Sequence, residues 1–507
     1  MNKLLILDRA KRFLGAMVLM ASLAFSHFIS ARTIVIGDSG DYPTLRAAAS
    51  GIRPGDTLVL QSQFFDDGAQ FLSEWTGTAS DPIVIRAERE HEAIFRGGSA
   101  AIHLIKCHYV VIEGLIFEGQ TGNGVNIDDG GDYDIPSKHI TVRNCIFREM
   151  NTRGNNDFLK MSGIDSFLVE GCVFVNGSRG GSGIDFVGCH YGVVRGCSFD
   201  NAGSSGVQCK GGSLRIRVEK NVFKNISQRA INLGGSTGLE YFRPPLPNPI
   251  VDAYEAADLE VFSNIFIGSL APIAYVGSVG VKVYNNTFYE PEKWVIRILQ
   301  ENTTQGFLPC SNNEFRNNII YLERDKTEVN IGPNTNAGTF IFSNNLWFNA
   351  QDSRWSPSLP VRDRDQIIAN PLFTDLANED LSIPPGSPAV GAGFIFDEPA
   401  TDFTGKAYYS PPSIGAYEGY ETTTSLKEDA GVSSVVVYPN PTSNTSIIRG
   451  DFTDASLQVF DARGVLIVRS EGISFLNEID LSREASGIYF IHLRQGDHFI
   501  IKKLVKW

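Results

Sequence analysis

The sequence predicts an all-β chain in which a right-handed parallel β-helix solenoid is followed by a small C-terminal β-sandwich. Three observations predict this architecture. A short phrase ending in phenylalanine recurs along the chain, a second set of short alternating strands lies between its copies, and Gly- or Asn-rich turns separate the two. The composition agrees, because the 507 residues include 50 Gly and 33 Phe and only 20% are charged.

The recurring phrase begins with valine, carries Gly, Asn or Cys near its middle and ends with phenylalanine. Its copies end at Phe117, Phe147, Phe174, Phe199, Phe223, Phe266 and Phe288. Consecutive copies lie 22 to 30 residues apart, except for one interval of 43. Such spacings with almost no helix between them are typical of β-solenoids, whose coils bury their apolar side chains only against neighbouring coils.

The second strand of each coil has apolar residues at its second and fourth positions, as Val125 and Ile127 illustrate. Strand alternation sends these residues inward, so the position between them is expected to face outward. The predicted outward column is Asn126, Lys160, Asp185, Gln208, Asn232, Ala274, Arg297 and Asn330. Because coils stack at about 4.8 Å, this column predicts a continuous polar stripe of the kind that holds extended polymers.

The domain boundaries follow from changes in pattern. An amphipathic segment at 42–50 is expected to form a capping helix before the first strands at 56–60 and 82–86. The repeats lose regularity after Trp347, and a polar linker is predicted at 421–432. We therefore expect a β-helix over 32–420 and a separate β-sandwich over 433–507.

The N-terminus has the layout of a secretory signal peptide over residues 1–31. Basic residues precede an apolar run at 13–25, and small residues follow it. An uncleaved membrane anchor is the alternative, but the run of about 13 residues is shorter than the roughly 20 needed to span a bilayer.

Charge and cysteine usage restrict the partners. The net charge of −13 is spread along the chain without a basic stripe, which argues against nucleic acid as a partner.

The cysteines follow the repeat. Three of the seven, Cys145, Cys172 and Cys197, occupy equivalent places in successive repeats, so we expect inward-facing thiols rather than a disulfide framework. A monomer is expected.

The C-terminal region closely resembles the sorting domain of type IX secretion substrates. The resemblance is carried by the phrases at 438–442, 457–464 and 486–490 and by the basic residues Lys502, Lys503 and Lys506. It implies that the secretion machinery is a partner and that the protein is secreted or held at the surface of a Gram-negative bacterium. An ordinary accessory β-sandwich would also fit the strand pattern.

The N-terminal half of the predicted solenoid is similar to the pectin-lyase-like superfamily. Its segments at 54–60, 77–88 and 110–117 look like the opening coils of polysaccharide lyase family 6. That resemblance implies β-elimination of a uronate polymer, in which the sugar carboxylate is neutralised, often by Ca²⁺, while a basic side chain removes the C5 proton. The resemblance places the base at Lys210, and the family's arginine falls at Gly234.

The residues themselves supply a candidate site. A group of charged residues falls on or beside the predicted stripe: Lys160, Asp185, Lys210, Arg229, Arg297 and Glu301. Neighbouring cations favour deprotonation of a lysine, so Lys160 or Lys210 is predicted as the base, with Asp185 beside it and Arg229 or Arg297 holding the carboxylate. A solvated ladder of alternating charges would give the same pattern.

Further residues are expected to bind the polymer. Asn126, Gln208 and Asn232 lie in the column, and Trp294 and Tyr289 lie near Arg297 in sequence, where an aromatic ring could stack on a sugar. The surplus residues of the long interval, 236–257, are expected to form a loop that walls the binding face.

An acidic turn beside the stripe is a candidate calcium site. Asp128, Asp129 and Asp132 fall within seven residues that also include two glycines. Oxygen-rich turns can hold Ca²⁺, whereas an ordinary turn also uses Asp and Gly for its backbone conformation.

Two other functions remain open from the sequence. A hydrolase would need two carboxylates, and Asp128 and Asp185 lie two coils apart, or roughly 9 to 10 Å, at the upper limit for an inverting pair. A non-catalytic protein that binds glycans or mediates adhesion is the alternative outside the enzymes, because a fold does not fix a function.

Overall fold

The computed structural model describes residues 31–150, 154–323, 327–396, 401–419, 435–450, 452–462, 465–496 and 498–507. The predicted linker and all but the last residue of the predicted signal peptide lie outside the described residues. The chain divides into two compact units, 1–420 and 421–507.

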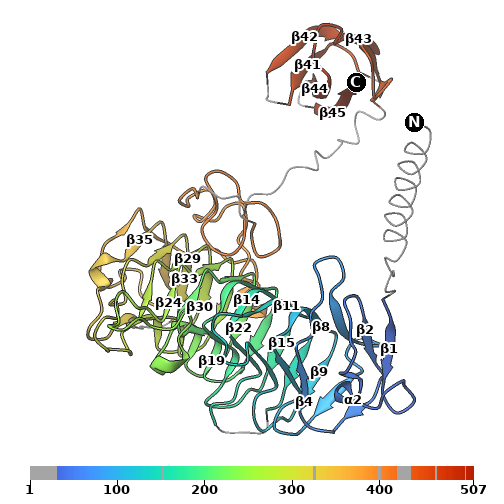
Figure 1. Ribbon diagram of the computed structural model, residues 1–507. Coiled ribbons are helices and arrows are strands. Elements are labelled where there is room, and N and C mark those ends of the chain that lie inside the picture. Colours follow the sequence, from blue (N-terminus) through green and yellow to red (C-terminus); the bar gives the residue numbers. More distant parts are fainter. Residues whose placement is uncertain are drawn as a thin grey trace, which may run out of the picture. The chain divides into compact units, whose positions relative to one another are not determined.

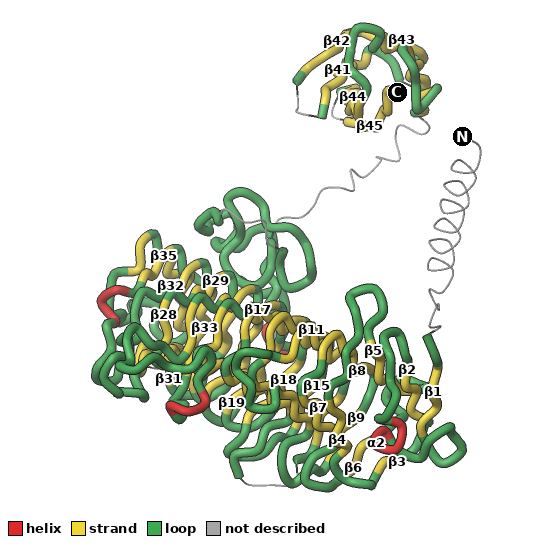
Figure 2. The backbone as a smooth tube through the Cα atoms, viewed as in Figure 1, coloured by secondary structure: helices red, strands yellow, loops and turns green. Residues whose placement is uncertain are grey.

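The first unit is a right-handed parallel β-helix, as the sequence predicts (Figure 1). In its described part, successive coils add strands to three parallel sheets, which have 16, 12 and 10 strands. Figure 2 shows helix only in short segments between these strands.

The 16-stranded sheet consists of β1 (Thr33–Ile36), β2 (Thr57–Leu60), β5 (Ile83–Ala87), β8 (His108–Glu113), β11 (Ser137–Arg143), β14 (Ile164–Glu170), β17 (His190–Arg195), β20 (Ser213–Leu214), β21 (Arg217–Glu219), β24 (Ala256–Ala257), β25 (Glu260–Phe262), β28 (Ser278–Val279), β29 (Lys282–Tyr284), β32 (Glu314–Arg316), β35 (Ile341–Ser343) and β37 (Asp363–Arg364). The 12-stranded sheet consists of β3 (Phe64–Phe65), β6 (Ile94–Arg96), β9 (Ile116–Glu118), β12 (Ile146–Arg148), β15 (Val173–Val175), β18 (Ser198–Asp200), β22 (Val222–Lys224), β26 (Ile265–Ile267), β30 (Thr287–Tyr289), β33 (Ile319–Leu322), β36 (Leu346–Asn349) and β38 (Ile367–Ile368). The 10-stranded sheet consists of β4 (Gln70–Ser73), β7 (Ile102–Ile105), β10 (Val125–Asp128), β13 (Leu159–Ser162), β16 (Ser182–Val187), β19 (Ser205–Lys210), β23 (Arg229–Gly234), β27 (Ala271–Val276), β31 (Trp294–Leu299) and β34 (Thr327–Ile331).

The register of the 10-stranded sheet confirms the predicted column. Each residue pairs with the next along the sheet, from Asn126 with Lys160 to Arg297 with Asn330. The flanking residues, such as Val125 and Ile127, are fully buried. Alternation with a period of two therefore sets which side chains face out.

The interior is built from ladders of like residues. The phenylalanines that end the recurring phrase stack along the 12-stranded sheet, with ring centroids 4.7 Å apart for Phe174 and Phe199 and for Phe199 and Phe223. A second buried ladder joins Asn221, Asn264, Asn286, Asn318, Asn345 and Asp363 through side-chain hydrogen bonds. All seven cysteines are free and buried, as expected from their places in the repeat.

The first coil is capped by a short helix, α2 (Leu45–Ala48), whose N-cap Thr44 accepts a hydrogen bond from the Ala47 amide. Leu45 and Ala48 are buried against the coil, as an amphipathic cap requires. The other short helices among the described residues are η1 (Leu239–Tyr241), η2 (Ala337–Thr339) and η3 (Leu376–Asn378). None of the helices in the described ranges is long and apolar enough to cross a membrane.

The second unit is antiparallel and has its own apolar core, which includes Ile448, Leu457 and Ile491. One sheet comprises β39 (Val436–Tyr438), β40 (Thr445–Arg449) and β43 (Leu476–Asp480). The other comprises β41 (Ala455–Asp461), β42 (Leu466–Ile473), β44 (Gly487–Gln495) and β45 (His498–Lys506). Two small packed sheets match the predicted β-sandwich.

Candidate functional site

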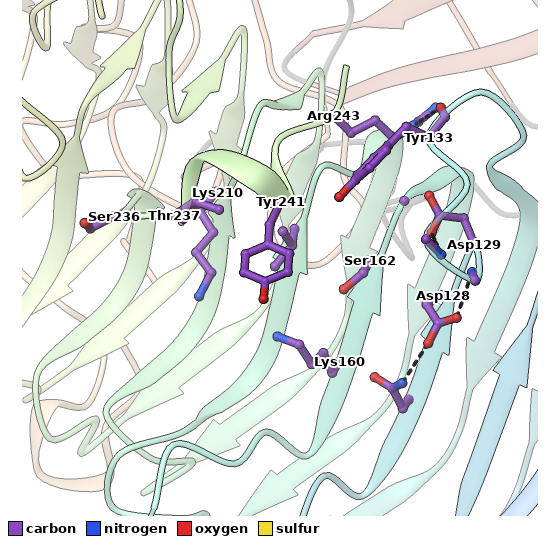
Figure 3. Close-up of a pocket in the computed structure, with 16 residues that line it drawn as sticks. Asp128, Asp129, Tyr133, Lys160, Ser162, Lys210, Ser236, Thr237, Tyr241 and Arg243 are labelled. Atoms are coloured by element: carbon purple, nitrogen blue, oxygen red, sulfur yellow. Dashed lines mark hydrogen bonds between the residues drawn. The ribbon is translucent and has the colours of Figure 1, made fainter. Parts of the chain in front are cut away.

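A cavity of about 520 Å³ lies over the 10-stranded sheet, between the acidic turn after β10 and the loop after β23 (Figure 3). Strands β10, β13 and β19 supply Asn126, Asp128, Lys160, Ser162 and Lys210 to its lining. The loop supplies residues 236–238, Tyr241 and Arg243. Predicted site residues from three strands therefore meet in one cavity, walled by the loop as expected.

Asp185 joins the two lysines of the cavity. Its Oδ2 accepts a hydrogen bond from Lys160, and its Oδ1 lies 3.1 Å from Lys210 Nζ. The carboxylate is buried, because the two lysine side chains cover it from the neighbouring coils. The expectation that the whole column is exposed is thus wrong for Asp185, and also for the buried Asn232 and Ala274.

Lys160 is held in its charged form. Burial alone would lower its pKa, but attraction to Asp185 and to Asp157, whose Oδ2 lies 3.7 Å from the ammonium, raises the pKa above its ordinary value. This reverses the argument that neighbouring cations would favour deprotonation of Lys160, since its nearest charged neighbours are acids.

Asp157 lies beneath Lys160 and escaped the sequence analysis, because it precedes the aligned strand row. It is buried, and its Oδ1 accepts a hydrogen bond from the Ser182 amide. Burial, together with repulsion from Asp185, raises the pKa of Asp157 to about 6. Two buried acids, Asp157 and Asp185, therefore lie beside the two lysines that line the cavity, within three neighbouring coils.

A histidine that sequence analysis missed extends the column by one coil. His103, in β7, pairs with Asn126, and its Nε2 lies 2.5 Å from Asp128 Oδ2. The Asn126 Nδ2 donates to Asp128 Oδ2 at 2.9 Å, and the Gly130 amide donates to Asp128 Oδ1 at 2.9 Å. These bonds outweigh the effect of burial and lower the pKa of Asp128, so this carboxylate stays ionised. The outward place of His103 between Ile102 and Leu104 is the signal that could have found it.

The three aspartates of the acidic turn do not converge on one point. Asp128 bonds to His103 and Asn126, whereas Asp132 pairs with Lys106 at 3.4 Å. Asp129 turns inward, where burial raises its pKa. No cluster of three His, Cys, Asp or Glu side chains in the described ranges could hold a metal ion. Calcium binding at this turn stays a prediction.

The loop that walls the cavity is anchored by Arg243. Its guanidinium is buried and reaches Asp165 Oδ1 at 2.8 Å, the Gly188 carbonyl at 2.9 Å and His190 Nδ1 at 3.3 Å. The hydroxyl of Tyr133, on the acidic turn, donates to the backbone carbonyl of Glu240 in the loop. The two walls of the cavity are thus tied to each other and to the coils below.

A second anchor holds the base of the same loop. The fully buried Glu255 accepts hydrogen bonds from the Thr237 amide and hydroxyl, the Gly211 amide and the Asn302 side chain. These donors satisfy the carboxylate, which fixes Thr237 beside Lys210 at the cavity edge.

Tyr241 closes the cavity from the loop side. In Figure 3 its ring lies over the gap between Lys210 and Lys160, with the hydroxyl directed toward the strands. The side chain is well exposed and is the aromatic residue nearest to the two lysines in this view. A polymer lying along the sheet would pass beneath it.

The remaining predicted residues form a separate group further along the sheet. Arg229 donates to Asn232 and pairs with Glu301 at 2.5 Å, while Arg297 donates to Asn330 and stacks on the ring of Trp294 at 4.4 Å. None of these side chains lines the cavity.

Two other predicted residues lie apart from this group. Gln208 lies in the column between Asp185 and Asn232 and is partly exposed. Tyr289 is on the 12-stranded sheet, where it donates to Glu323, whereas Arg297 is on the 10-stranded sheet.

Comparison with known proteins agrees with this architecture. Residues 89–241 match the family described as the right handed beta helix region, and residues 436–507 match the secretion system C-terminal sorting domain. No curated protein matches the chain by sequence.

Solved structures share the fold at low identity. The chain is similar to the pectate lyase Pel9A, at 13% identity and a TM-score of 0.50 over 78% of this chain and 98% of that one. It is also similar to a mannuronic acid specific polysaccharide family 6 lyase from human gut microbiota, at 14% identity and a TM-score of 0.37 over 60% and 83%. A tailspike protein of an E. coli bacteriophage matches at 12% identity and a TM-score of 0.40 over 92% and 87%. At these identities the likeness shows the fold alone.

The coils and the C-terminal match together define an exported right-handed parallel β-helix protein. More particularly, the chain shares its fold with a pectate lyase and carries a type IX secretion sorting domain at 436–507. This domain directs export to the cell surface or the extracellular space.

Proposed function

We propose that the protein is a polysaccharide lyase that cleaves a uronate-containing polymer by β-elimination. One observation carries the proposal: the buried carboxylate of Asp185 holds Lys160 and Lys210 side by side at the floor of the walled cavity. A compact cluster of this kind favours catalysis over the even ladder of charges expected on a surface that only binds. Polysaccharide lyases are also among the proteins that share the fold.

The two lysines take different roles in the proposed reaction. Lys160 has a raised pKa and remains an ammonium ion, so we assign it to the uronate carboxylate, whose neutralisation makes the C5 proton more acidic. Lys210, which lies one coil beyond Asp185, is assigned as the base that removes this proton. The electron pair left at C5 forms the C4–C5 double bond.

The leaving oxygen at C4 must gain a proton as its bond breaks. The hydroxyl of Tyr241 is directed into the cavity beside both lysines, so we assign Tyr241 as the donor (Figure 3). Asp185 acts as a positioning residue, because it is buried beneath the lysines and fixes where their ammonium groups lie.

Hydrolysis by Asp128 and Asp185 is less well supported by the same contacts. Asp185 is covered by two lysines and Asp128 is engaged by His103, so neither carboxylate lies open to attack a sugar or to activate water. The predicted two-coil separation alone does not make them a catalytic pair.

The test is cleavage of alginate, pectate and glycosaminoglycans by the mature chain, measured by the ultraviolet absorbance of the unsaturated product. Lys210→Ala should lower turnover at least about 100-fold, the scale of losing a positioned proton-transfer group. Lys282→Ala, which removes an exposed lysine on the 16-stranded sheet, is the matched control and should retain activity. New reducing ends without absorbance would instead identify a hydrolase, and binding without cleavage would identify an adhesion protein.

A further inference from the structure

A second groove lies on the 16-stranded sheet, where the chain bends within each coil. The bend residues of four successive coils are Tyr109, His139, Ser166 and Tyr191, with φ values of 52°, 56°, 57° and 59°. The strand registers of β8, β11, β14 and β17 place these four residues in one column, and Figure 1 shows β8, β11 and β14 side by side.

Rings are unexpected at these positions. A positive φ is rare for residues other than Gly and is most tolerated by Asn and Asp. Two other bend columns of this solenoid largely follow that preference, as Asn144, Gly171 and Gly196 show for one and Asn176 and Asn201 for the other, although Lys220 and Glu149 depart from it without introducing a ring. Strands β8, β11 and β17 instead carry the ring-bearing residues Tyr109, His139 and Tyr191 at the position of positive φ. Backbone outliers that carry bulky side chains point to a function for those side chains.

The column contains a gap of the size of one ring. Tyr109 and His139 stack with centroids 4.3 Å apart, whereas the small Ser166 separates His139 from Tyr191 by two coils, or about 9 to 10 Å. Ring pairs prefer centroid distances of about 4.5 to 7 Å, so one further ring fits between His139 and Tyr191 in contact with both. Arg215 lies over the Tyr191 ring at 5.9 Å, from the coil beyond.

The walls of this gap suit a sugar. A cavity of about 460 Å³ has Phe167 and Leu168 at its floor and hydroxyl groups at Thr78, Thr141 and Ser166. A pyranose ring has apolar C–H faces that pack on aromatic rings and a rim of hydroxyls that bond to Ser and Thr. Neither ring at the gap is shielded from solvent, because both His139 and Tyr191 are exposed.

The charges beside the gap favour an acidic sugar. Lys138 precedes His139 in β11, and Arg215 borders Tyr191. Both side chains are exposed, and Arg215 Nε lies 3.8 Å from Asp258 Oδ2. The acid of the neighbouring strand, Asp165, is engaged by the buried Arg243 and so does not offset them. A carboxylated or sulfated polymer therefore meets Lys138 and the Arg215–Asp258 pair at the rim of the groove, where the charge of Lys138 attracts it.

We propose that the groove between His139 and Tyr191 binds one sugar ring of an acidic polysaccharide, as a second site on a different sheet from the cavity of Lys160 and Lys210. It would hold the polymer to the protein independently of cleavage. The proposal does not depend on the lyase assignment, because none of its residues lines that cavity.

The test is affinity electrophoresis of the full mature chain in native gels that contain alginate, pectate, a glycosaminoglycan or a neutral glucan. The test variant is His139→Asn/Tyr191→Asn, because Asn removes each ring yet tolerates the left-handed backbone. The control is Tyr42→Asn, which removes an exposed tyrosine from the first coil. Thermal unfolding confirms that each variant folds.

We expect at least one acidic polymer to retard the wild type, the control and the Lys160→Ala/Lys210→Ala variant. The ring variant should bind that polymer about 10-fold more weakly, the effect of losing two stacking rings. Equal retardation of ring variant and wild type, or no retardation of the wild type by any acidic polymer, would overturn the proposal. Equal retardation by the neutral glucan would overturn its acidic specificity. Loss of binding only in the lysine variant would locate the sole site in the cavity, which also overturns it.

Discussion

Lys210 Nζ lies 3.1 Å from Asp185 Oδ1, and the other oxygen of that carboxylate accepts a hydrogen bond from Lys160. Three neighbouring strands, β13, β16 and β19, each contribute one member of this group. The arrangement holds the amino groups of the two lysines close together at one carboxylate. It is the basis of the proposed chemistry.

Replacement of Asp185 tests whether Lys160 must carry its charge. Asp185 raises the pKa of Lys160, so Asp185→Asn should lower the pH at which Lys160 loses its proton. If the ammonium holds the sugar carboxylate, the alkaline limb of the kcat/KM profile moves to lower pH by about one unit or more. The measurement is the pH dependence of product absorbance.

The control for that profile is Asp66→Asn, which removes an exposed acid that pairs with Arg96 away from the cavity. Its alkaline limb should match the wild type. Removing one member of a buried ion pair typically costs about 3 to 5 kcal/mol, so thermal unfolding must confirm that Asp185→Asn is folded. If Asp185→Asn is folded and the alkaline limb of its kcat/KM profile is unshifted, the charge of Lys160 is not required for the reaction.

Arg243 is predicted to hold the loop over the cavity. Arg243→Ala leaves Asp165 and the Gly188 carbonyl without their buried donor, so the loop at 236–252 should detach while the coils remain folded. We expect KM to rise and a protease to cut within this loop at least about 10-fold faster, since local opening governs proteolysis. Mass spectrometry of the first fragments locates the cut, and the exposed Arg89→Ala is the control. First cuts elsewhere would contradict the anchoring role.

Asp363 should make the stability of the solenoid depend on pH. Burial raises its pKa to about 6, from an ordinary value of 3.8. An acid whose pKa is higher in the folded chain than in the unfolded chain stabilises the fold while it is protonated. Its contribution to the free energy of unfolding is therefore complete below about pH 3.8 and is lost as the pH rises through about 6. Asp363→Asn can still accept from Asn345 and Trp347 through its amide oxygen.

We therefore expect Asp363→Asn to flatten the fall in stability between about pH 4 and pH 6. At pH 7 the variant should exceed the wild type by about 1 to 3 kcal/mol, the scale of a two-unit shift. Denaturant unfolding at several pH values gives the measurement, and the exposed Asp365→Asn should follow the wild type. Parallel curves for Asp363→Asn and the wild type would show that the buried acid does not titrate in this range.

Deletion of residues 433–507 should separate export from folding. The two units have their own cores, so the unfolding temperature of the remaining solenoid should change by less than about 2 °C. Because the sorting domain directs export, the truncated protein should be retained in the cell. Immunoblots of the culture medium and the cell fraction provide the readout, and normal secretion of the truncated chain would refute this prediction.

The sequence alone determined the coil and the orientation of its side chains. Val125 and Ile127 are apolar on either side of Asn126, and the same alternation recurs in every coil, so burying the apolar residues leaves one outward position per strand. The recurrence of the phenylalanine that ends each phrase likewise indicated the length of each coil. Both patterns are local and periodic, and such patterns can be followed along a single chain.

The tertiary structure alone decided which outward residues meet and which are covered. Asp185 is outward yet buried, because Lys160 and Lys210 reach over it from coils 25 residues away on either side. Arg243 meets Asp165 across 78 residues, and His103 meets Asp128 across 25. The directions and lengths of side chains from different coils set these contacts. They are not periodic, so no pattern in the sequence specifies them.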